Sequence, residues 1–99
     1  MIANGQDESL VILAEECSEV VKAASKIHRW GADSNNKGRN SLTNLEELIF
    51  ELGDLQAMID IVIDQFGIDR SAIINGSQLK KNKLKTYSRH LQQYGRSEN

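Results

Sequence analysis

The sequence predicts an all-α protein made of a helical hairpin and a third helix. Apolar residues recur in steps of three and four over three segments, proline is absent, and the connections are rich in glycine and asparagine. Ninety-nine residues correspond to about one small domain, so we expect a single domain over 1–99. Because so short a chain leaves much of its surface exposed, we also expect it to self-associate.

The first predicted helix begins near Asp7 or Ser9, either of which can act as its N-cap, and it ends near Gly31. The positions of its apolar stripe are Leu10, Leu13, Cys17, Val20, Ala24 and Ile27. The positions on the flank of that stripe are Ile12, Glu16, Glu19 and Ala23. The only cysteine, Cys17, cannot form an intramolecular disulfide, and we expect it to be a small buried residue in a reducing compartment.

The second predicted helix follows a polar surface loop over 31–42. Thr43 and Glu46 have the spacing of a capping box, and Gly67 is a natural residue to follow the last turn. The apolar stripe of this helix consists of Leu45, Leu48, Leu52, Leu55, Ile59, Val62 and Phe66.

The third predicted helix is capped by Asp69 and extends through Leu84, with Leu91 as its furthest apolar position. Four lysines make this helix basic: Lys80, Lys81, Lys83 and Lys85. We expect 88–99 to be a fraying end.

Acidic residues dominate the second helix, because the segment 44–66 holds six acids and no lysine or arginine. Three of them, Glu47, Glu51 and Asp54, share one narrow strip beside the apolar stripe. Like charges at this spacing destabilise a helix by about 0.2–0.5 kcal/mol per pair. From spacing alone, the strip is either a solvated acidic face or a site for a hard divalent cation, which prefers carboxylate oxygens.

Each of the first two helices presents an acidic pair three residues apart. Glu16 and Glu19 form the first pair, and Glu51 and Asp54 form the second. If the helices pack antiparallel, the two pairs face each other and unpaired carboxylates would repel strongly. Because the four acids come without histidine or cysteine, this set of ligands favours Mg²⁺ or Mn²⁺ over zinc.

The strings EECSE (15–19) and ELGD (51–54) resemble the EExxE and ExxD motifs of the MazG-like, all-α nucleoside triphosphate pyrophosphohydrolases. The resemblance covers roughly residues 9–85 and is closest to the short, single-domain members found in phages and bacteria. It implies a dimer or tetramer of four-helix-bundle type. It also implies hydrolysis of nucleoside or deoxynucleoside triphosphates to monophosphate and pyrophosphate with Mg²⁺ or Mn²⁺, with two or more ions when substrate is bound. This activity controls the nucleotide pool, and the resemblance slightly favours a purine substrate such as dGTP.

The resemblance assigns roles to particular residues. The implied metal ligands are Glu16, Glu19, Glu51 and Asp54. The adjacent acids Glu15 and Glu47 are candidates to orient or deprotonate the attacking water. The candidate nucleotide contacts are Lys80, Lys83, Trp30 and Lys26, although each is also typical of a solubilising helix face or, for Trp30, of a core or interface anchor.

Two other classes of function fit parts of the sequence. A non-catalytic helical dimer or adaptor could use the acidic strip to bind a basic partner. A helical phosphohydrolase that releases single phosphates is less consistent with the sequence. Its usual His-Asp metal motif is absent, because neither His28 nor His90 has an adjacent aspartate. The acidic net charge of −2 argues against a nucleic-acid partner. The polar N-terminus and the lack of a long apolar run predict a cytoplasmic protein with no membrane partner, in the host cytoplasm if a phage encodes it.

Overall fold

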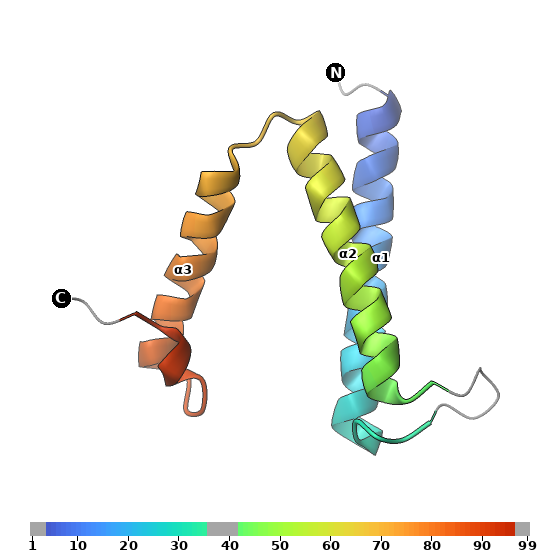
Figure 1. Ribbon diagram of the computed structural model, residues 1–99, viewed down its shortest axis with the longest axis vertical. Helices are drawn as coiled ribbons and strands as arrows, with labels where there is room; N and C mark the ends of the chain where they lie inside the picture. Colours follow the sequence, from blue (N-terminus) through green and yellow to red (C-terminus); the bar gives the residue numbers. More distant parts are fainter. Residues whose placement is uncertain (1–3, 36–41, 97–99) are drawn as a thin grey trace. The chain divides into compact units, whose positions relative to one another are not determined.

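The computed structural model describes residues 4–35 and 42–96. The described chain forms α1 (Asn4–Trp30), α2 (Asn44–Gln65), α3 (Arg70–Tyr87) and a short 3₁₀ helix, η1 (Gln92–Tyr94) (Figure 1). It contains no strand beyond a single bridge between Asn35 and Thr43, so the all-α prediction is confirmed. The chain divides into two units, Met1–Phe66 and Gly67–Asn99, which are described separately below.

In the first unit, α1 and α2 run side by side in opposite directions and form the predicted hairpin (Figure 1). The helix α1 begins earlier than predicted, at Asn4, so Ser9 lies inside it and its hydroxyl donates to the Gly5 carbonyl, 2.9 Å away. It ends where predicted, and Gly31 follows it with a φ of 90° that glycine adopts without strain.

The predicted capping box of α2 is confirmed. The Thr43 side chain accepts a hydrogen bond from the Glu46 amide at 3.1 Å, and the Glu46 carboxylate accepts one from the Thr43 amide at 3.0 Å. These two hydrogen bonds lower the pKa of Glu46. The far end is also as expected, since Gly67 follows the cap residue Phe66 with a φ of 62°.

The contact face of α1 is displaced from the predicted stripe toward its predicted flank. Ala23 is 4% exposed and, with the partly buried Ile12, lies on that flank, whereas Cys17 and Ala24 on the predicted stripe are exposed. The other four members of the stripe are partly buried: Leu10, Leu13, Val20 and Ile27. The stripe is therefore confirmed in part, and the prediction that Cys17 is buried is wrong.

The inward face of α2 agrees only partly with its predicted stripe. Ile63 is buried, and four members of the stripe are partly buried: Leu48, Leu55, Ile59 and Val62. Leu45, Leu52 and Phe66 are exposed. The hairpin therefore buries one side of the stripe and leaves a second apolar face open.

In the second unit, the carboxylate of Asp69 caps α3 by accepting the Ser71 amide at 2.9 Å, as predicted. The helix ends at Tyr87, and the prediction that 88–99 frays is wrong for the described part. That segment folds back toward α3 through η1 (Figure 1). There the backbone amide of Arg96 donates to the Asn82 side chain at 2.9 Å, and the Lys85 ammonium donates to the Arg96 carbonyl at 2.7 Å. Every residue of α3 remains at least partly exposed.

Within 4–35 and 42–96, none of the helices combines the length and the apolar character needed to span a membrane.

Candidate carboxylate site between two helices

Three carboxylates meet where α1 packs against α2. Glu16 comes from α1, and Glu51 and Asp54 come from α2, and one oxygen from each lies within 4.8 Å of the others. Antiparallel packing sets the two helices level, and the three-residue spacing places Glu51 and Asp54 on the same side of α2. The structure thus brings together three of the four acids predicted as metal ligands. We call these three residues the carboxylate cluster.

The fourth predicted ligand, Glu19, is not a member of this cluster. Its carboxylate lies 3.3 Å from the Lys22 ammonium, on the same helix. Their side chains are 44% and 67% exposed, and an ion pair so open to water contributes little to stability. Moving Glu19 toward the cluster therefore requires breaking only a weak contact.

The cluster is electrostatically unfavourable for its own carboxylates. The pKa of Glu16 and that of Glu51 are both raised above the ordinary 4.5. Partial burial is the largest cause, and repulsion from Asp54 is the next. The charge of Glu19 adds to both shifts, and the charge of Glu47 adds to that of Glu51. Among the described residues, no lysine or arginine forms an ion pair with a member of the cluster. Three converging carboxylate oxygens without a basic partner form a set of ligands that suits Mg²⁺ or Mn²⁺.

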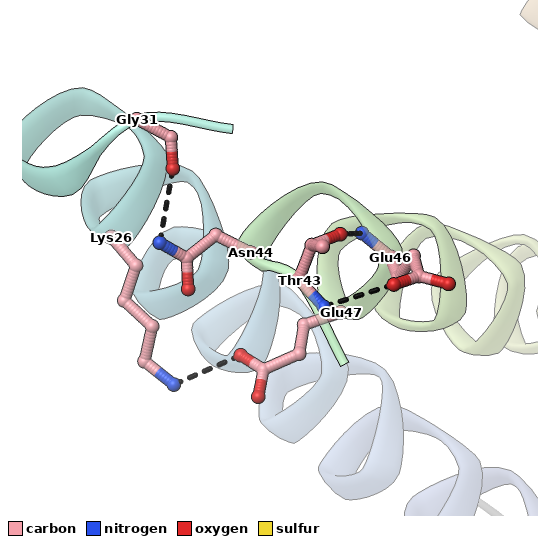
Figure 2. Close-up of polar contacts among 6 residues, drawn as sticks. All are labelled: Lys26, Gly31, Thr43, Asn44, Glu46 and Glu47. Atoms are coloured by element: carbon pink, nitrogen blue, oxygen red, sulfur yellow. Dashed lines mark hydrogen bonds and ion pairs between the residues drawn. The ribbon is translucent and has the colours of Figure 1, made fainter. Parts of the chain in front are cut away.

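A lysine does reach across the hairpin one turn away. The Lys26 ammonium of α1 lies 3.0 Å from the Glu47 carboxylate of α2, and their side chains are 25% and 12% exposed (Figure 2). The candidate catalytic acid Glu47 and the candidate nucleotide contact Lys26 are therefore partners of each other in this structure.

Next to this pair, Asn44 fastens the start of α2 to the end of α1. Its side-chain amide donates to the Gly31 carbonyl at 3.0 Å (Figure 2). Its backbone amide donates to the Ser34 carbonyl at 2.7 Å. Asn44 is 2% exposed. This anchor was not predictable, because an asparagine that follows a polar loop is expected to remain in solvent.

The remaining predicted residues lie on exposed surfaces. Glu15 and Trp30 are exposed on α1, with Trp30 at the end of the helix, next to the loop. Lys80 and Lys83 are exposed on α3, in the second unit. Their proposed contacts with a nucleotide stay predictions.

Known proteins add nothing to this picture. Comparisons of the chain with family models, curated proteins and solved structures give no match.

Proposed function

We propose that this protein is a metal-dependent pyrophosphohydrolase that converts nucleoside or deoxynucleoside triphosphates to monophosphate and pyrophosphate, with a slight preference for a purine deoxynucleotide such as dGTP. The observation that carries the proposal is the carboxylate cluster: three acids from two helices converge within 4.8 Å with no basic partner among the described residues. The motif resemblance supplies the reaction. An acidic cluster fits metal binding in general, whereas EExxE followed by ExxD is typical of this hydrolysis.

In this proposal Glu16, Glu51 and Asp54 hold the metal, and Glu19 joins them by releasing Lys22. When bound, Mg²⁺ or Mn²⁺ would shield the triphosphate, lower the pKa of a water molecule and stabilise charge on the leaving pyrophosphate. Glu15 and Glu47 are proposed to orient the water or accept its proton as the bond between the α- and β-phosphates breaks. Keeping the three carboxylates together requires only the packing of α1 against α2.

Nucleotide contacts are proposed from residues outside the cluster. Lys80 and Lys83 lie one turn apart on α3, so both ammonium groups can bind the phosphates. Trp30 is 66% exposed at the end of α1, which leaves its ring free to stack on a base. Lys26 could reach a phosphate after leaving Glu47.

Self-association is part of the proposal, because the hairpin leaves an apolar face open. Ile49 and Leu52 are 59% and 46% exposed, and Leu45 lies beside them on α2. We expect sedimentation equilibrium at micromolar concentration to show a dimer or tetramer, and we expect Ile49→Lys to shift it toward monomer. Ser18→Lys, on the exposed side of α1, is the control and should leave the assembly intact. A wild-type protein that stays monomeric would contradict this part of the proposal.

The experiment that tests the activity incubates the wild-type chain with a panel of NTPs and dNTPs. Mg²⁺, Mn²⁺ or a chelator is present, and the nucleotide products are resolved. We expect equimolar monophosphate and pyrophosphate, and the loss of both with the chelator. Release of single phosphates would point instead to the other phosphohydrolase class. No turnover of any nucleotide, together with capture of a basic peptide by the acidic strip, would favour the adaptor function.

A further inference from the structure

The ion pair between Lys26 and Glu47 is better buried than the pair between Lys22 and Glu19. Its atoms lie 3.0 Å apart and it joins α1 to α2, whereas the Lys22–Glu19 pair is open to water and lies within one helix. A charge in this protected position is screened less by solvent and salt, so it acts on neighbouring groups over a longer range.

Glu47 lies within the electrostatic reach of the carboxylate cluster. It is one helical turn before Glu51, on the same strip of α2, and carboxylates at this spacing repel each other. The Lys26 ammonium, 3.0 Å from the Glu47 carboxylate, offsets the charge that Glu47 brings to this strip.

We infer that Lys26 is a built-in counter-ion that sets how tightly the carboxylate cluster binds a divalent cation, because it offsets the charge of Glu47 beside that cluster. The inference rests on the proposed function and adds a control on metal affinity to it. Lys26 is paired with Glu47 and not with Glu16, Glu51 or Asp54, so it acts through Glu47 as a positioning residue. In this inference the pair alters the electrostatic potential at the carboxylate cluster and not the positions of its three carboxylates.

The test is titration calorimetry of the full chain with Mg²⁺ and with Mn²⁺, in the absence of nucleotide. Lys26→Met leaves the charge of Glu47 uncompensated and should tighten binding by about three- to tenfold, and Glu47→Gln should weaken it by a similar factor. The double variant restores the net charge of the pair and should bind nearly as the wild type does. Lys26→Arg keeps the charge and should also resemble the wild type.

A charge control is available on the same helix. Arg29 is exposed on α1 three residues from Lys26, and Arg29→Met should change metal affinity by less than about twofold, since solvent and salt screen its charge. Thermal unfolding of every variant in chelator identifies losses of affinity that come from a damaged fold.

The outcomes separate this inference from the proposed function. If the wild type binds the cations but Lys26→Met and Glu47→Gln both weaken binding, or neither changes it, the pair is merely structural and the inference is overturned while the metal site stands. If the wild type binds neither Mg²⁺ nor Mn²⁺, the metal site itself is wrong and the inference fails with it.

Discussion

Glu51→Gln is expected to abolish nucleotide hydrolysis, lowering turnover by more than about 100-fold, since even outer-shell partners of a metal ligand contribute 10- to 100-fold. Glutamine keeps the shape of the side chain but removes the charge that would bind the cation. Glu51 offers one of the three side-chain oxygens that lie within 4.8 Å of one another, so the substitution removes one of the three converging charges. Turnover with saturating Mn²⁺ and calorimetric titration of Mn²⁺ measure the two consequences.

The same substitution should stabilise the hairpin when no divalent cation is present. Burial and repulsion raise the folded-state pKa of Glu51 above 4.5, so the folded chain holds this proton more tightly than the unfolded chain. Ionising Glu51 therefore costs the folded chain stability. This penalty is absent below pH 4.5, where Glu51 is protonated in both states, and it grows as the pH rises through 4.5 to the raised pKa. Glutamine has no such penalty, so its advantage in melting temperature should increase over that window and then stay constant.

Glu8→Gln is the matched control, because Glu8 is an exposed acid on α1. It should leave turnover, metal binding and the melting temperature in chelator nearly unchanged. A Glu51→Gln protein that keeps full turnover would refute the assignment of Glu51 as a metal ligand. A lower melting temperature in chelator, at neutral pH, would show instead that the Glu51 charge is already neutralised within the folded chain.

Local signals in the sequence predicted both ends of α2, the start of α3 and the end of α1, because caps act over three or four residues, but they missed the start of α1. Thr43 with Glu46, and Gly67, bound α2 as expected, and Asp69 begins α3. The faces of the helices were less predictable. Cys17 is exposed because the contact face of α1 is displaced from the apolar stripe toward its flank, and this displacement depends on the partner helix rather than on periodicity.

The candidate site shows the same division between local and tertiary information. Spacing along α2 was enough to place Glu51 beside Asp54, and antiparallel packing was enough to bring Glu16 to them. The partner of Glu47 was not predictable, because Lys26 is twenty-one residues away in the sequence and reaches it only through the packing of the hairpin. Glu19 fits the motif but points to Lys22, a contact that motif spacing does not encode.

Asn44→Ala is expected to destabilise the hairpin through the loss of a buried hydrogen bond. The Asn44 side chain is buried and donates to the Gly31 carbonyl at 3.0 Å, so alanine removes this hydrogen bond and leaves a space (Figure 2). We expect a loss of about 1–3 kcal/mol in the free energy of unfolding. For a chain of this size, each kcal/mol corresponds to about 4–8 °C in melting temperature.

The position of Asn44 links this loss to the candidate site. Asn44 ties the first turn of α2 to the end of α1, and two further bonds join the same segments: the Asn44 amide to the Ser34 carbonyl and the Leu45 amide to the Ala32 carbonyl. These contacts set the register of α2 against α1, and the register decides which acids of the two helices lie opposite each other. Asn44→Ala should weaken Mn²⁺ binding as well as stability, when both are measured at one protein concentration. Asn35→Ala makes the same chemical change at an exposed loop position and should cost less than about 0.5 kcal/mol. Equal, small effects of the two substitutions would mean that packing of α1 against α2, without this anchor, is sufficient to align the carboxylates.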